Sequence, residues 1–274
     1  MMMQSRPVGE LLRTWRQRRS LSQLDLALRA EVSARHVSFM ETGRSKPSRE
    51  MLLHLAEELD IPLRERNALL VAGGFAPVYS EGNLDEPALR VAREAVDLVL
   101  TGHEPYPALA VDRHWTLVAA NRAVGLLLEG VSPELVRPPV NVLRLSLHPE
   151  GLAPRIINLV QWRGHVLSRL HHQVDVTADE TLAALLEELR ELPPPGGGTW
   201  PKGPAREPDI AGVVVPLRLT SRFGVLSFFS TTTVFGTPVD ITLAELAIES
   251  FFPADRETAE VLRRVSVDAS PGDA

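Results

Sequence analysis

Hydrophobic residues recur at helical spacing in short runs along the first 76 residues, and polar caps or glycines separate the runs. We predict five helices, which begin at Pro7, Ser22, Ser33, Ser48 and Pro62. Serine is favoured as an N-terminal cap and proline at the start of a helix. The third and fifth helices end at Gly43 and Gly73, since glycine suits the residue after a helix. Residues 1–76 are therefore expected to form a compact all-α domain.

The same spacing predicts which side chains are buried. The expected core residues of the first three helices are Val8, Leu11, Leu12, Trp15, Leu24, Ala27, Leu28, Val32, Val37 and Met40. Ala27 is small, as suits a point where two helices cross closely. The arginines of the first helix, Arg13, Arg16, Arg18 and Arg19, are expected to face solvent or phosphate.

After a linker and a connecting helix over residues 77–105, the pattern changes to a mixture of strands and helices. Strands are predicted over 108–112, 116–120, 212–219, 224–234 and 241–252, although residues 243–249 alone would suit a helix. Helices are predicted over 86–101, 121–128, 158–174, 178–192 and 256–265. Residues 193–208 are expected to form a Pro/Gly-rich loop, and residues 266–274 a disordered tail. The fold class is multidomain α and α+β, with an antiparallel sheet in the domain at 106–265.

Composition narrows the function classes. The chain has 274 residues and no cysteine, which excludes disulfides, thiolate metal sites and cysteine nucleophiles. No apolar stretch predicts secretion or a membrane span, so a cytoplasmic protein is expected. The net charge of −6 argues against nucleic-acid binding, but residues 1–49 hold ten Lys/Arg against four Asp/Glu. Residues 77–274 hold 17 against 26. A basic head on an acidic body is typical of a DNA-binding domain attached to a second module.

The second and third helices, joined by a tight turn, suit insertion of one helix into the major groove of DNA. The candidate DNA-binding residues are Gln23, Ser33, Ala34, Arg35, His36, Ser38, Arg44, Ser45 and Lys46. Arg35 can contact guanine or a phosphate, and Gln23 can contact a phosphate and brace the third helix. Glu41 is expected to be structural. A plain helical bundle with a solvated basic face is the alternative.

Residues from Pro7 to about Ala76 resemble the lambda-repressor-like, or Xre-type, helix-turn-helix family. The resemblance implies binding to a double-stranded DNA operator. One position departs from the family pattern, because Glu31 stands in the turn where the family usually has glycine. A positive φ at this residue would cost on the order of 1 kcal/mol.

Four segments resemble a narrower family, the MmyB-like regulators, from about Pro7 to Val265. They are residues 35–77 together with DRHWTLVAANRA, NLVQWRGHVLSRL and FGTPVDITLAELAIESFFPAD. The resemblance implies a C-terminal PAS-like domain that binds a small effector, with an apolar or fatty-acyl ligand favoured.

Large apolar side chains in this domain are candidates for a ligand pocket. The candidate ligand-binding residues are Trp115, Leu126, Trp162, Arg163, His165, Leu167, Phe228, Phe229 and Phe235. Arg163 or His165 could meet a carboxylate head. The aromatic residues could equally be core, and Arg163 could pair with Glu245 or Glu249.

Neither a metal site nor an enzyme is predicted. His171 and His172 are adjacent and would diverge on a helix, and no GxSxG, Walker or GxGxxG motif is present. We expect a transcription regulator without a cofactor that binds a palindromic operator as a homodimer. Ligand in the C-terminal domain would act on DNA binding through the helix at 86–101. The alternative is a C-terminal platform for dimerisation or protein interaction that holds no ligand.

Overall fold

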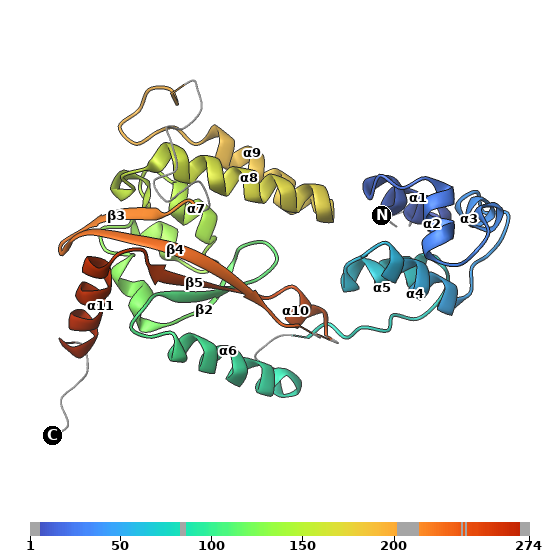
Figure 1. Cartoon of the computed structure of the whole chain (residues 1–274), viewed down its shortest axis with the longest axis horizontal. Helices are drawn as coiled ribbons and strands as arrows, with labels where there is room; N and C mark the ends of the chain where they lie inside the picture. The colour runs from blue at the N-terminus through green and yellow to red at the C-terminus, as the bar shows by residue number, and fades with distance from the viewer. Residues whose placement is uncertain (1–5, 83–85, 202–213, 237, 239, 269–274) are drawn as a thin grey trace. The chain divides into compact units, whose positions relative to one another are not determined.

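The computed structural model describes residues 6–82, 86–201, 214–236, 238 and 240–268. The chain forms two compact units, each with its own hydrophobic core (Figure 1). The first comprises the residues up to 82, with which the short segments 175–177 and 237–244 are grouped. The second comprises the remaining residues.

Residues 6–82 fold into five short helices around one core, as the hydrophobic pattern predicts. The helices are α1 Val8–Arg18, α2 Gln23–Arg29, α3 Ala34–Glu41, α4 Arg49–Glu58 and α5 Leu63–Ala72. Ser22, Ser33 and Ser48 each accept a backbone hydrogen bond as N-caps. Gly43 follows α3 with φ 72°, which confirms the predicted stop.

The turn between α2 and α3 keeps its tight geometry despite the glutamate in it. Glu31 has φ 52°, in the left-handed region, so the turn carries a strain on the order of 1 kcal/mol. The amide of Val32 donates to the carbonyl of Ala27 across the turn at 2.9 Å. Val37 and Met40 then point from α3 into the core, each 1% exposed.

The prediction for the inward face of α2 is partly wrong. Ala27 is buried as expected, but Leu24 and Leu28 are 58% and 70% exposed. Leu26 and Ala30 are buried instead. The buried face of α2 therefore includes Ala27 but lies on the side of Leu26 and Ala30. This face also satisfies helical spacing.

Arg16 corrects a second prediction, because it faces the core and not solvent or phosphate. Its Nε donates to Glu41 Oε1 at 2.6 Å and its Nη2 to Oε2 at 2.9 Å, and both side chains are buried. The third donor group, Nη1, reaches the carbonyl of Leu21 at 2.7 Å. Gly9 allows α1 to approach this point, because a Cβ there would lie 2.5 Å from the carbonyl oxygen of Met40.

The second unit is built on a five-stranded antiparallel sheet with the strand order β2-β1-β5-β4-β3. The strands are β1 Ala108–Val111, β2 Leu117–Ala120, β3 Leu217–Ser221, β4 Gly224–Val234 and β5 Ala247–Pro253. The α-helices are α6 Arg90–Gly102, α7 Val142–Leu147, α8 Leu159–Thr177, α9 Glu180–Glu191 and α11 Arg256–Asp268. Short 3-10 helices occupy Pro87–Leu89, Arg122–Leu126, Pro133–Val136 and Ala153–Arg155.

Helices cover both faces of this sheet (Figure 1). The side that carries Leu109 and Phe228 faces α7, α8 and α9, and the main core lies there. The opposite side meets α6 at β1 and α11 at β4 and β5. Alternating side chains thus give the sheet two buried faces.

Most elements predicted from residue 86 on are present, and the differences are local. The predicted strand over 241–252 divides into a helical turn, α10 Ile241–Ala244, and β5. The Asp240 carboxylate accepts from the amides of Thr242 and Leu243 and so starts the turn. The helix predicted over 121–128 is a 3-10 helix. The sequence does not predict α7, because its six residues are too few to show a helical period. The predicted positions 202–208, 212–213 and 269–274 lie outside the described residues.

We predict that Glu41→Gln lowers the free energy of unfolding of the first unit by about 3–5 kcal/mol, because it leaves the buried Arg16 cation unpaired. Hydrogen exchange at the amides of α1 and α3 in the full chain measures this loss. The exposed Glu57→Gln provides the control and should change protection little. The double variant Arg16→Met/Glu41→Met should lose less stability than Glu41→Gln. A loss equal to the sum of the losses in Arg16→Met and Glu41→Met alone would contradict a coupled pair.

Candidate DNA-binding surface and ligand cavity

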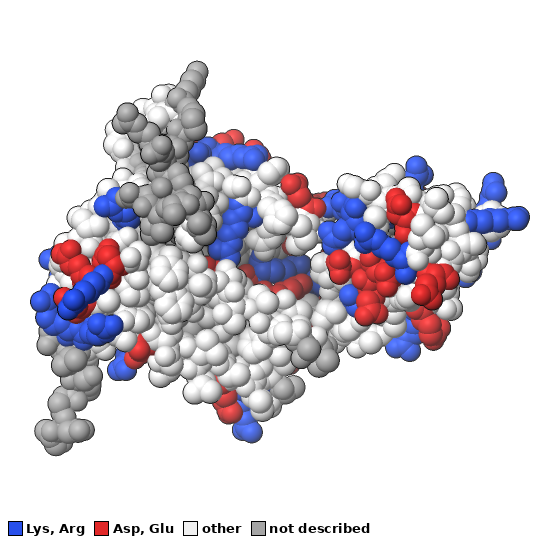
Figure 2. All heavy atoms as spheres, in the orientation of Figure 1, with Lys and Arg blue, Asp and Glu red and all other residues white. Residues whose placement is uncertain are grey.

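The outer face of α3 and the loop after it present polar and basic side chains. Arg35, Arg44 and Lys46 are exposed, while Pro47 is buried and fixes the end of the loop. Basic side chains also project at the end of the five-helix unit where α3 lies (Figure 2). The structure brings the candidate residues of α3 and its loop together, namely Ser33, Ala34, Arg35, His36, Ser38, Arg44, Ser45 and Lys46.

Phe39 organises the basic side chains, and sequence reasoning did not select it. The guanidinium carbons of Arg35 and Arg44 lie 5.0 and 5.8 Å from the centre of its ring. The amides of Arg44 and Ser45 both donate to its carbonyl. A cation over an aromatic ring is held without losing its charge, so the ring positions two cations for an anionic partner.

Gln23 and Ser33 have structural bonds that bear on their predicted roles. The Nε2 of Gln23 donates to Glu41 Oε2 at 2.8 Å, which fixes its side chain at the start of α2. The hydroxyl of Ser33 accepts from the amide of His36 as the cap of α3. Glu41 is structural, as predicted. From the end of α3 it accepts hydrogen bonds from Gln23 of α2 and from Arg16 of α1.

An apolar cavity of about 160 Å³ lies in the second unit, beside the sheet face that carries Leu109 and Phe251. Helix α8 contributes Trp162, His165, Val166 and Arg169 to its lining. The further lining residues are Trp115, Leu117, Val124, Leu127, Leu128, Val136, Val140, Val142, Leu143, Leu145, Ser146, Leu152, Leu217, Ser230 and Glu249. The volume corresponds to about five water molecules, each taking roughly 30 Å³.

A charged pair lies within this apolar lining. Arg169 Nη2 donates to Glu249 Oε1 at 2.5 Å and to Thr232 Oγ1 at 2.7 Å. The Glu249 side chain is 5% exposed, and the Arg169 guanidinium lies 4.6 Å from the centre of the Trp115 ring. The two charges balance, so the pair offers polar atoms to the cavity without net charge.

Trp115 and His165 complete the polar end of the cavity. Trp115 has φ 65°, and its Nε1 donates to Gln173 Oε1 at 2.8 Å, which fixes the ring. Burial lowers the pKa of His165, and Arg169 lowers it further against the opposing effect of Glu249. The surroundings of the imidazole therefore favour its neutral form.

The structure brings Trp115, Trp162 and His165 of the ligand candidates to the cavity. Arg163 lies instead over the Trp200 ring at 4.4 Å, and its Nη2 donates to the carbonyl of Arg190. The alternative pairing of Arg163 with Glu245 or Glu249 is wrong, because these glutamates pair with Arg113 and Arg169.

The remaining candidates lie elsewhere. Phe228 is fully buried in the core, and Leu167 packs against this core. Phe229 stacks on Phe252. Both rings lie on the face of the sheet opposite to the cavity-lining Ser230 and Phe251. Phe235 follows β4 and is half-buried, outside the cavity lining. Sequence reasoning missed Arg169 and Glu249 as a cavity pair.

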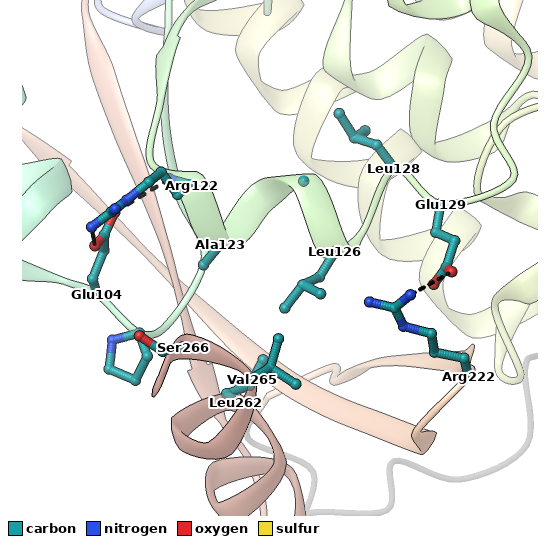
Figure 3. A pocket seen from close by; sticks show the side chains of 12 residues that line it. Glu104, Arg122, Ala123, Leu126, Leu128, Glu129, Arg222, Leu262, Val265 and Ser266 are labelled. Carbon is teal, nitrogen blue, oxygen red and sulfur yellow. Dashed lines mark hydrogen bonds and ion pairs between the residues drawn. The ribbon is translucent and has the colours of Figure 1, made fainter. Parts of the chain in front are cut away.

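Leu126 lines a separate, open groove of about 550 Å³ (Figure 3). Leu262 and Val265 of α11 face it across the groove. Two ion pairs lie at its ends, Arg122 with Glu104 at 2.9 Å and Arg222 with Glu129 at 3.6 Å. Its charged groups thus pair with one another.

Among the residues that the structure describes, no group of three or more His, Cys, Asp or Glu side chains is placed to hold a metal ion. Within the same residues, no helix has the length and apolar character that crossing a membrane requires.

Comparison with protein families matches each of the two units to a family. The model of the MmyB-like transcription regulator ligand binding domain matches residues 92–265, which is more than half of the chain. A helix-turn-helix model matches residues 12–66, which include α2 and α3. Neither family is one of enzymes, and the comparison with curated proteins finds no match. The chain therefore belongs to the MmyB-like transcription regulators, with a DNA-binding helix-turn-helix unit followed by a ligand-binding domain.

Proposed function

We propose that α3 reads operator DNA and that a small, mainly apolar ligand in the cavity modulates this binding. For DNA, the observation that supports the proposal is the exposed basic face around Phe39. Arg35 contacts a base edge, while Arg44, Ser45 and Lys46 contact phosphates. Gln23, held by Glu41, contacts the phosphate beside α2. Two copies bind a palindromic operator as a homodimer, with their α3 helices about one DNA turn apart.

For the ligand, the supporting observation is an apolar cavity with one neutral polar end. A fatty-acyl chain fits the apolar lining, and its polar end lies beside Arg169 and His165. Arg169 is already neutralised by Glu249, so a free carboxylate would meet the buried Glu249 anion. The charge balance therefore favours an uncharged polar end. The small volume favours a short chain or one that displaces side chains.

A second candidate function keeps the DNA contact and makes the C-terminal domain a dimerisation or protein-interaction platform. The membership of Trp115, Trp162 and Phe228 in one buried hydrophobic core favours it, because the aromatic side chains beside the cavity also serve as core. Native mass spectrometry of the purified protein separates the two functions. A bound lipid supports the ligand proposal, and a domain that repeatedly purifies empty supports the platform.

We predict that Arg35→Ala weakens binding to the selected operator by about 1–3 kcal/mol and relaxes the preference at one base pair. Binding selection from random DNA pools, followed by affinity measurements at several salt concentrations, tests this. Lys46→Ala is the matched control, because loss of a phosphate contact should weaken all sequences alike and reduce the salt slope by about one. Equal behaviour of the two variants would contradict these roles.

We predict that the protein binds a medium-chain fatty alcohol more tightly than the fatty acid of the same length. Glu249→Gln should shift this preference towards the acid by about tenfold or more, because it frees the charge of Arg169. Calorimetry with both probes measures the shift. Glu188→Gln, whose carboxylate pairs with Arg144 outside the cavity lining, should leave the preference unchanged.

A second variant tests the location of the ligand. Val166→Phe fills the cavity, so it should abolish binding of both probes and make DNA affinity independent of them. A wild-type preference for the acid that Glu249→Gln does not alter would place the polar end away from Arg169.

A further inference from the structure

Helix α6 carries an exposed apolar stripe. Val91 and Leu98 are each 74% exposed, the highest values among the large hydrophobic residues that the structure describes. Ala95 and Gly102 share their side of the helix, because positions 91, 95, 98 and 102 recur at three- and four-residue spacing. Val99 flanks the stripe and is 41% exposed. Exposed apolar residues that are contiguous along a helix mark an interaction surface.

The other side of α6 is fixed to the sheet. Val96 and Leu100 are buried against the β1 side, at 0% and 3% exposure. Asn121 donates to the carbonyl of Leu100 at 3.1 Å, and a ring nitrogen of His103 lies 3.0 Å from the carbonyl oxygen of Phe251. The helix therefore cannot rotate its stripe inward, and it presents a preorganised face.

Charges beside the stripe favour one kind of partner. Arg90 and Asp97 lie seven residues apart on the same flank and are largely exposed. Each forms a long ion pair within the helix, Arg90 with Glu94 at 3.7 Å and Asp97 with Arg93 at 3.6 Å. Such exposed pairs exchange partners at little cost.

In an antiparallel pair of α6 helices, this flank meets the same flank of the other copy. Each Arg90 then meets the partner's Asp97, which gives two symmetric ion pairs. In a parallel pair this flank would face the other flank of the partner helix, where Ala92 and Val99 carry no charge. The charge pattern therefore complements itself only in the antiparallel arrangement.

We propose that α6 is a dimer interface, on which a second copy of this chain packs its own α6 antiparallel about a two-fold axis. Val91 packs against the partner's Leu98, and Ala95 of the two copies meet at the centre, where small side chains allow close approach. The proposal rests on the homodimer of the proposed function and identifies its surface and its orientation.

The size of the stripe limits the strength of the pair. A 13-residue helix is about 20 Å long, so the two stripes alone bury less area than the 1,200–2,000 Å² of a typical stable interface. Exposed ion pairs contribute little to affinity and mainly select orientation. We therefore expect a weak dimer in solution that DNA with two half-sites strengthens by linkage.

Single cysteines test the surface and its orientation, because the natural chain has no cysteine. Ala95→Cys should form an intermolecular disulfide with itself under mild oxidation. Val91→Cys and Leu98→Cys should each remain uncrosslinked alone but crosslink when mixed, as read by mass labels on a non-reducing gel. Identical positions lie seven residues apart along the antiparallel seam, about 10 Å, which exceeds the reach of a disulfide near 7 Å.

The control is Val160→Cys, an exposed valine on α8, which should not crosslink. Self-crosslinking of Val91→Cys and of Leu98→Cys would show parallel pairing and overturn the antiparallel proposal. Slow alkylation of both cysteines in the monomer would mean that another part of the chain covers the stripe, which also overturns it.

Sedimentation separates failure of this interface from failure of the homodimer. Leu98→Asp should raise the dimer dissociation constant at least about tenfold, while Val160→Asp leaves it unchanged. A wild-type dimer that Leu98→Asp does not weaken would keep the homodimer and overturn the α6 interface. A wild type that stays monomeric alone and on its selected DNA would overturn both.

Discussion

The carboxylate of Glu41 is the group on which the DNA-binding unit depends. It receives N–H donors from Arg16 on α1 and Gln23 on α2, while it belongs to the last residue of α3. A buried ion pair repays the cost of its desolvation only when its partners are placed well. The same contacts therefore fix the angle between α2 and α3 and the position of Gln23 beside α3. Gly9 serves this constraint, because any larger residue would push α1 away from the end of α3.

The ligand-binding domain contains a second pair of this kind, with a different consequence. Glu249 is as buried as Glu41, but its partner Arg169 is one-third exposed and borders a cavity. Three N–H donors hold the carboxylate of Glu41, whereas a cavity lies beside Glu249. The first pair therefore acts as a fixed joint, and the second gives an apolar cavity a polar end whose charge can be balanced or unbalanced by a guest. Both units also place a cation over an aromatic ring, Arg35 on Phe39 and Arg169 on Trp115.

Local chemistry made much of this fold predictable. Serine caps, prolines and glycines lie close to the ends of the five helices, and the β-branched runs give the hairpin of β3 and β4. The inward face of α2 could not be predicted, because two faces of this helix satisfy helical spacing. Leu24 and Leu28 lie on one side of Ala27, and Leu26 and Ala30 lie on the other. Arg16 lies next to Trp15 on a helix rich in arginine, and only its distant partner on α3 distinguishes it. Arg169 and Glu249 are 80 residues apart in sequence. They come together because the strand order places β5 in the middle of the sheet, and local sequence patterns do not predict that order.

The β1 strand links the cavity and the stripe on α6. Leu109 of β1 lines the cavity, while the neighbouring Ala108 and Ala110, which point to the other face, are fully buried on the side where α6 packs. Only one strand separates the cavity from α6, and alanine side chains hold the strand and the helix close. Close-packed interiors transmit small displacements because they contain little free volume. A guest that enlarges a cavity of this size must move its walls, and β1 is the wall that α6 shares. For the proposed α6 dimer, we expect that displacement to reach the seam between the copies and to change the spacing on which binding to two half-sites would depend.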